Sequence, residues 1–233
     1  MILESLTILL AVFLILIILR ATTRLSDSYD KYQNTPLSMT IFIAFWLIYL
    51  SVLSYTEFLV DFTFPPMMPL MVVIPLMVLI VLLLFRKATA DLLSTISVSW
   101  LIYIQSFRII VEIIIWGAYN QGIIPIETTF EGGNVDIIVG LTAVPLAYYA
   151  MRNKISPMAL IIWNIAGLLI LANTVRLFIT AGYFPALLGQ DENMLSVEFV
   201  KLPYLLIAGM FMPLAVLIHA LSIKQLLKLN KSK

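Results

Sequence analysis

Charged residues are scarce in this sequence, and their scarcity sets its broad class. Only 12% of the 233 residues are Asp, Glu, Lys or Arg, whereas a soluble domain has roughly 25%. Hydrophobic residues make up 62% of the chain, and the mean hydropathy is +1.05. A chain with so little solvating surface is predicted to be a multi-pass membrane protein, with membrane lipids as its first partners. The formal net charge of +1 gives no support to a nucleic-acid partner.

Cysteine is absent, which excludes disulfides, thiolate metal sites and cysteine nucleophiles. His219 is the only histidine, so there is no HExxH motif, and we interpret His219 as a packed or hydrogen-bonded residue. Glycine-rich nucleotide-binding motifs, a GxSxG motif and Asp-rich diphosphate-binding motifs are also missing. Glu127, Glu131 and Asp136 are oxygen ligands within ten residues, but their spacing matches no calcium loop. We therefore predict neither a metal site nor a cofactor.

Seven apolar segments are long enough to cross a bilayer, which takes about 20 helical residues. They cover residues 2–19, 37–55, 67–85, 92–118, 137–151, 158–181 and 202–223. The sequence therefore predicts an all-α fold, a single domain of residues 1–233 built as a bundle of seven transmembrane helices. Pro69 and Pro75 lie in the third segment, and Pro203 and Pro213 in the seventh. We expect kinks there, because neighbouring helices can satisfy the freed carbonyl groups.

The basic residues outside the segments fall on one side of this predicted bundle. On the other side only Lys201 is basic, while most of the acidic residues lie there. This asymmetry predicts an N-terminus outside and a C-terminus in the cytoplasm. We expect the protein in the inner (plasma) membrane of a bacterium. The cytoplasmic side carries Arg20, Arg24, Lys31, Arg86, Lys87, Arg152, Lys154, Lys224, Lys228, Lys231 and Lys233.

Arg108 and Glu112 place charge inside the fourth apolar segment, and ionisable residues at such depth mark a functional site by default. At about 100° per residue, one stripe of this helix is polar or aromatic. It consists of Gln105, Arg108, Glu112, Trp116 and Tyr119. The i, i+4 spacing of Arg108 and Glu112 predicts an ion pair. That pair either belongs to a ligand site or only fixes helix packing.

Two further segments supply polar residues at a similar depth. Asn173 and Arg176 lie on one face of the sixth segment, and Arg176 is expected either to face Arg108 and Glu112 or to reach the headgroups. Asp136 would be the counter-ion of Arg176 in the first case. Just before the fifth segment, Glu131 and Asn134 join Asp136 in a glycine-containing turn. Helix capping explains Asn134 and Asp136 equally well, but it does not explain Glu131.

One pattern of this sequence resembles a pattern in small bacterial multi-spanning membrane proteins of unassigned function. It consists of Gln105-x-x-Arg108-x-x-x-Glu112, then Thr129-Phe-Glu-Gly, then Asn134-x-Asp136 leading to Gly140. The resemblance covers mainly the fourth and fifth segments. It implies a polytopic membrane fold and no particular activity.

These observations predict a charged pocket in the outer half of the bilayer that binds an amphipathic or anionic small molecule or a lipid. Arg108 and Arg176 would engage the ligand, and Glu112 with Asp136 or Glu131 would orient them. The alternative is a membrane enzyme acting on a lipid or isoprenoid, with Glu112 as the catalytic acid or base. A proton-coupled transporter and a structural subunit of a membrane complex are further alternatives.

Overall fold

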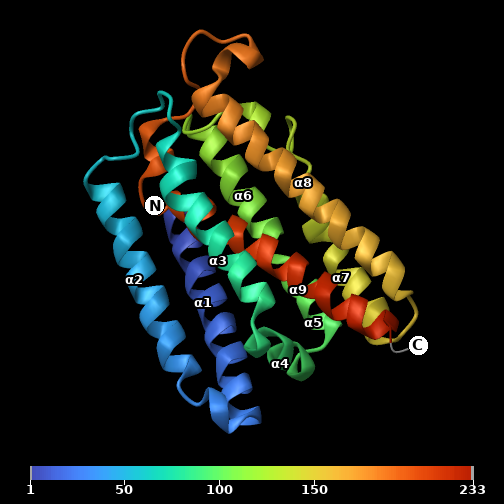
Figure 1. Cartoon of the computed structure of the whole chain (residues 1–233). Helices are drawn as coiled ribbons and strands as arrows, with labels where there is room; N and C mark the ends of the chain where they lie inside the picture. Colours follow the sequence, from blue (N-terminus) through green and yellow to red (C-terminus); the bar gives the residue numbers. More distant parts are fainter. Residues whose placement is uncertain (1, 232–233) are drawn as a thin grey trace.

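The computed structural model describes residues 2–231, and every regular element in that range is helical (Figure 1). This confirms the predicted all-α fold. The predicted domain, 1–233, extends at both ends into residues outside those described, and Lys233 of the predicted basic tail is among them. The α-helices are α1 (Ile2–Ser28), α2 (Thr35–Tyr55), α3 (Ile74–Phe85), α4 (Lys87–Thr95), α5 (Val98–Ile104), α6 (Phe107–Asn120), α7 (Ile137–Met151), α8 (Pro157–Tyr183) and α9 (Met212–Lys231).

Shorter helical turns join or extend these helices. Two are π-helical and run directly into a following α-helix: η2 (Pro69–Val73) leads into α3, and η6 (Ile207–Phe211) leads into α9. Four are 3-10 turns: η1 (Asp30–Tyr32), η3 (Ile126–Thr128), η4 (Pro185–Leu188) and η5 (Val197–Val200). Successive long helices alternate in direction, and α1 begins at the opposite end of the bundle from the end of α9 (Figure 1).

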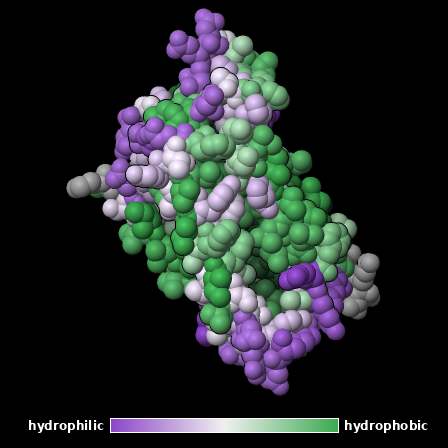
Figure 2. Space-filling view, turned by 60° about the vertical axis from the view of Figure 1, so that its left-hand side comes forward, coloured by the Kyte–Doolittle hydropathy of each residue, from purple (hydrophilic) through white to green (hydrophobic). Residues whose placement is uncertain are grey.

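Five helical runs in the described chain are long and apolar enough to cross a membrane: Ile2–Ser28, Asp30–Tyr55, Val98–Asn120, Pro157–Tyr183 and Ile207–Leu229. A sixth is reached if Pro69–Phe85 and Lys87–Thr95, bent by 75°, form one span, and α7 is shorter. In the most apolar stretch of the run Asp30–Tyr55 only 11% of residues are buried. Its apolar side chains therefore face outwards, and Figure 2 shows a hydrophobic belt between two hydrophilic ends. Such a surface suits an apolar solvent.

The predicted segment 92–118 is not one helix. Residues 92–95 belong to α4, the backbone at Ile96 and Ser97 is extended, and Gln105 and Ser106 separate α5 from α6. At the end of α4, the Ser94 and Thr95 hydroxyls donate to the carbonyls of Asp91 and Leu92. Side chains of this kind compete with helical hydrogen bonds and favour a helix end.

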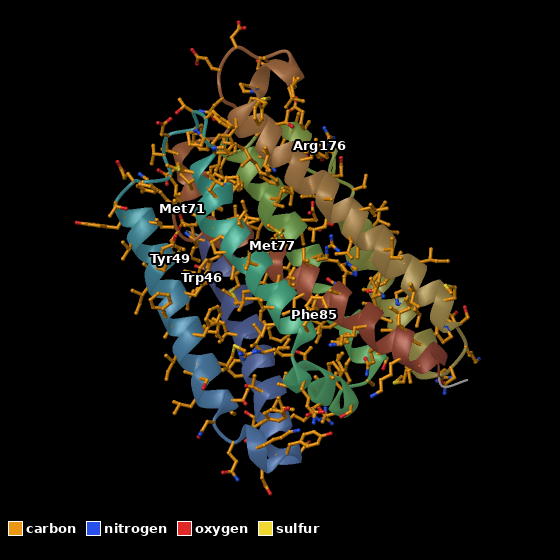
Figure 3. All side chains as sticks on the ribbon, in the orientation of Figure 1. Trp46, Tyr49, Met71, Met77, Phe85 and Arg176 are labelled. Carbon is orange, nitrogen blue, oxygen red and sulfur yellow. The ribbon has the colours of Figure 1, made fainter. Side chains whose placement is uncertain are left out.

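The π-helical turns accommodate two of the four prolines that were expected to cause kinks. Pro75 and Pro213 have no N–H, so the carbonyls of Met71 and Gly209, four residues earlier, lose their helical donors. The Tyr49 hydroxyl donates to the Met71 carbonyl at 3.1 Å, and the Trp46 indole N–H donates to the Gly209 carbonyl at 2.8 Å. Figure 3 shows Trp46 and Tyr49 on α2 and Met71 on η2. One face of α2 therefore satisfies both acceptors, as the sequence led us to expect of a neighbouring helix.

α9 lies at the centre of the bundle, where it packs against α8 and contacts α3 and α5. The contact with α8 is close at Gly167, because a Cβ there would lie 2.4 Å from Cε1 of His219. α7 also approaches α6 closely, because a Cβ at Gly140 would lie 2.9 Å from the backbone nitrogen of Ile109. Two glycines thus bring α7 against α6, which holds Arg108 and Glu112, and α8 against His219 on α9.

Candidate functional site

Arg108 is the largest fully buried side chain near the middle of the bundle, with 1% of its surface exposed. Its Nε donates to Oδ2 of Asp136 at 2.7 Å, and its Nη2 forms an ion pair with Oδ1 of the same carboxylate. The pair is therefore bidentate, the strongest geometry between an arginine and a carboxylate. Asp136 is 4% exposed and stands at the N-terminal end of α7. The pair links α6 to α7.

The other side of the guanidinium contacts α9. Nη1 of Arg108 lies 2.8 Å from Nε2 of His219, and Nδ1 of His219 lies 2.9 Å from Oδ1 of Asn164 on α8. A guanidinium only donates and an amide oxygen only accepts. His219 is consequently a neutral imidazole that accepts at Nε2 and donates from Nδ1. Asn164 continues the chain by donating from Nδ2 to the Ser222 hydroxyl at 3.1 Å.

Glu112 lies one turn further along α6, is fully buried, and is held by an amide rather than by a cation. Both of its carboxylate oxygens accept from Nδ2 of Asn134, at 3.0 and 3.1 Å. Oδ1 of Asn134 in turn accepts from the Thr174 hydroxyl at 2.7 Å and from the Asp136 backbone N–H at 3.0 Å. Asn134 thus joins the loop before α7 to α6 and α8. We call the eight buried residues of these contacts the polar network: Arg108, Glu112, Asn134, Asp136, Asn164, Thr174, His219 and Ser222.

The predicted ion pair is wrong, and of the two alternatives for Arg176 the one that faces the site is not observed. Arg108 and Glu112 do not pair along the helix, because Asp136 and His219 occupy both sides of the guanidinium and Asn134 occupies the carboxylate. Arg176 does not face them either. It is exposed, donates from Nη2 to Oδ1 of Asn173 at 2.9 Å, and lies on the outer side of α8 (Figure 3). Asp136 is therefore the counter-ion of Arg108 and not of Arg176.

The remaining predicted residues surround the network without joining it. Gln105 is fully buried and donates from Nε2 to the Ala215 carbonyl at 3.1 Å, and Asn173 donates to the Gly133 carbonyl at 3.0 Å. Trp116 stacks on Phe130 with 6.3 Å between ring centroids, and Tyr119 packs against the hydrophobic core. Glu131 is exposed.

Four network members were not among the predicted site residues: Asn164, Thr174, Ser222 and His219. The sequence predicted a packed or hydrogen-bonded role for His219, but not its partner. Its contact with Arg108 joins residues that are 111 positions apart, so no helical periodicity connects them. The available signal was its uniqueness: it is the one histidine of the chain, in a helix whose apolar neighbours give it no partner.

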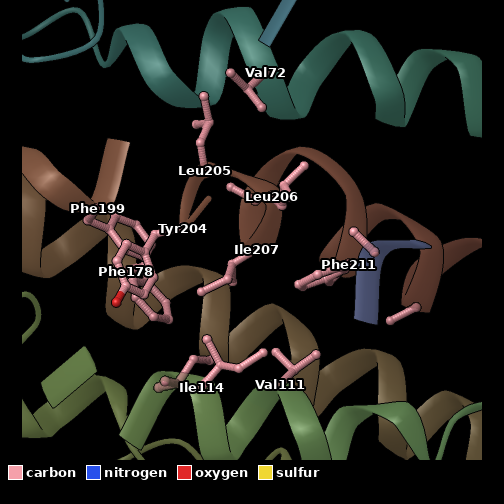
Figure 4. Packing of buried hydrophobic residues seen from close by; sticks show 14 of the residues in the cluster. Val72, Val111, Ile114, Phe178, Phe199, Tyr204, Leu205, Leu206, Ile207 and Phe211 are labelled. Atoms are coloured by element: carbon pink, nitrogen blue, oxygen red, sulfur yellow. The ribbon is translucent and has the colours of Figure 1, made fainter. Parts of the chain in front are cut away.

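An apolar pocket with a volume of about 80 Å³ borders the polar network, between η2, α6, α8 and η6. Four of its lining residues are polar and belong to the network: Arg108, Glu112, Asp136 and Thr174. The other lining residues are apolar. Figure 4 shows several of them, including Phe178 and Phe199, whose rings stack with 4.9 Å between centroids. The pocket is therefore an apolar space that borders two buried carboxylates.

The charges of the network do not cancel if both carboxylates are ionised. One guanidinium faces two carboxylates, Glu112 and Asp136, while His219 is neutral. Arg108 is neutralised by the bidentate contact with Asp136, so Glu112 is left without a cation of its own. Within residues 2–231, no three His, Asp or Glu side chains come together as metal ligands.

Comparison with known families adds one match. The family described as Domain of unknown function (DUF8737) matches residues 65–227. The chain belongs to this family. No curated protein and no solved structure matches the chain.

The DUF8737 region begins after α2 and ends within α9, so it contains the polar network and the neighbouring pocket in full. The helices α1 and α2 lie outside it. Membership of DUF8737 brings no activity with it, and the resemblance to small bacterial membrane proteins stays a prediction.

Proposed function

We propose that the protein crosses a membrane seven times, with the beginning of α1 outside and the end of α9 in the cytoplasm. The apolar belt and the alternating helix directions support this arrangement (Figures 1 and 2). η2 and α3 together, and α7 alone, would supply the two crossings beyond the five long runs. Within residues 2–231, the basic residues predicted to be cytoplasmic lie in the last turns of α1 and α9 or directly after α1, α3 and α7. We place the protein in a bacterial plasma membrane on the same charge asymmetry.

We further propose that the pocket beside the polar network binds a small amphipathic molecule. The observation that carries this proposal is the lining: apolar side chains from six helical elements (η2, α6, α8, η5, η6 and α9), with polar groups only where the network reaches the pocket. Small-molecule sites are commonly apolar with a few placed polar groups. The volume of about 80 Å³ is several times what a single water needs.

The charges decide which polar group the ligand carries. An anionic group would meet Glu112 and Asp136 and would find Arg108 already paired on both sides. A hydroxyl or an ammonium group can donate to Glu112, whose carboxylate accepts only from one amide nitrogen. A neutral or cationic amphiphile is therefore favoured over the anionic ligand suggested by the sequence.

A proton-transfer function has less support. The hydrogen bonds from Arg108 through His219 to Asn164 lead towards the cytoplasmic end of α9. The third member of this chain is a carboxamide, which holds its protons and does not relay them. We therefore assign these hydrogen bonds a structural role, in which they hold α6, α8 and α9 together.

Three eight-carbon amphiphiles with the same tail test the proposal: octylamine, octanol and octanoate. We expect octylamine and octanol to raise the Tm of the protein in lipid nanodiscs more than octanoate does. Glu112→Gln keeps the shape of the side chain and should remove the preference for octylamine. Glu131→Gln makes the same chemical change at an exposed position and should leave the preference intact. An equal response to all three amphiphiles, unchanged in Glu112→Gln, would contradict a ligand site at Glu112.

A further inference from the structure

A second and larger cavity shares no lining residue with the pocket beside the polar network. It has a volume of about 510 Å³ and lies between α1, α2, α3 and α9. Pockets of roughly 300–1,000 Å³ accommodate whole small molecules. Ser38 and Phe42 on α2 line it and are exposed. The cavity is therefore a groove on the outer surface of the bundle, and we call it the α2–α3 groove.

The α2–α3 groove is apolar along its length and polar at one end. On α2, its lining runs from Thr35 to Leu47, about 18 Å at 1.5 Å per helical residue. That length is roughly half of a hydrocarbon core of about 30 Å. The polar end is the one where α2 begins and α3 ends. On the membrane placement proposed above, the groove spans the inner leaflet, and its polar end lies at the cytoplasmic headgroups.

Two cationic side chains line that polar end. Arg86 follows α3 and is exposed, and its guanidinium has no hydrogen bond or ion pair within residues 2–231. Lys31 in η1 donates to Oδ2 of Asp91 at 2.7 Å, an ion pair that holds it beside the middle of α4 and compensates its charge. Asn34 and Ser38 line the same end and bring uncharged hydrogen-bond donors. This arrangement fits a group with negative charge and several acceptor oxygens.

We infer that the α2–α3 groove binds one phospholipid of the inner leaflet, with an acyl chain along α2 and α3 and the phosphate at Arg86, whose guanidinium is the cation at that end not paired with a carboxylate within residues 2–231. The apolar length matches one leaflet, and the free charge of Arg86 matches an anionic headgroup. A soluble phosphate compound would leave the apolar length unfilled. This lipid site is separate from the pocket at Glu112, since the two sets of lining residues share none.

The test is native mass spectrometry of the protein titrated with phosphatidylglycerol or with phosphatidylcholine of the same acyl chains. We expect one phosphatidylglycerol to bind more tightly than phosphatidylcholine. Arg86→Gln removes one charge-assisted contact and should weaken phosphatidylglycerol binding by about tenfold. Arg152→Gln removes the same charge from an exposed position outside the groove and should change binding little. Equal affinity for the two lipids, together with no effect of Arg86→Gln, would overturn the headgroup site.

A second variant tests the acyl chain independently. Leu79→Trp places a larger side chain in the groove wall at a half-buried position and should weaken the binding of both lipids. Unchanged lipid binding in Leu79→Trp would overturn the assignment of the chain to the groove. Glu112→Gln should not alter lipid binding, so failure of the ligand proposal and failure of the lipid proposal give different results.

Discussion

The ion pair between Arg108 and Asp136 makes a quantitative prediction about stability. Asp136→Asn removes the negative charge and keeps the size of the side chain, so a guanidinium that is 1% exposed loses its bidentate partner. Removing one member of a buried pair costs about 3–5 kcal/mol. Glu112, one turn along α6, remains in the network as a second carboxylate. We therefore expect a loss of stability at the lower end of this range, about 3 kcal/mol.

The assay is thermal unfolding in detergent, followed by the fluorescence of the four tryptophans. A loss of about 3 kcal/mol corresponds to a fall in Tm of roughly 6–12 °C for a chain of this length. The control is Lys201→Gln, which breaks the ion pair of Lys201 with Glu57, whose side chains are 29% and 62% exposed. Exposed pairs contribute little, so this control should shift the Tm far less.

A double variant separates loss of the pair from general damage to the core. Arg108→Met combined with Asp136→Leu replaces both charges by apolar groups, a change that is often neutral for a buried pair. We expect the double variant to be clearly more stable than the sum of the two single changes implies. Strict additivity, or a fall in Tm for Asp136→Asn no larger than for Lys201→Gln, would refute the argument that the pair holds α6 and α7 together.

Two further predictions concern contacts of α2 and α9. Trp46→Phe and Tyr49→Phe each leave a carbonyl without a donor, so each should lower the free energy of unfolding by about 1–3 kcal/mol. Denaturant titration measures this free energy. Wild-type stability in both variants would contradict the role of α2 in satisfying these carbonyls. Gly167→Ala would place a Cβ 2.4 Å from the His219 ring and should cost about 1–3 kcal/mol. Gly117→Ala is its control, because the nearest atoms to the added Cβ there belong to the flexible side chain of Leu3. Equal Tm values for the two variants would count against the close packing of α8 and α9.

Hydrophobicity and proline placement were enough to predict an all-α bundle and the approximate position of most helices. The breaks at Ile96–Ser97 and Gln105–Ser106 were not predicted, because apolar residues continue on both sides and no proline or glycine marks them. A hydropathy pattern records whether a residue prefers lipid. It does not record a bend made by serine and threonine hydroxyls bonding to their own helix.

The candidate site was found by its charges, but its pairing was not. Helical spacing paired Arg108 with Glu112 because it considers one helix at a time. The observed partners of Arg108 lie 28 and 111 positions away, and which of several carboxylates it contacts depends on how α7 and α9 pack. Asp136 and Asn134 were among the predicted candidates and both lie in the polar network, although capping alone would have accounted for both.

The contacts of Trp46 and Tyr49 with the two π-helical turns limit how far the polypeptide can be shortened. Both aromatic donors lie on α2, outside the DUF8737 region, and both carbonyl acceptors lie inside it. A chain shortened to residues 65–227 would expose two main-chain acceptors and one wall of the α2–α3 groove. The first two helices are therefore part of the folding unit, and family boundaries drawn from sequence similarity do not mark an independent module here.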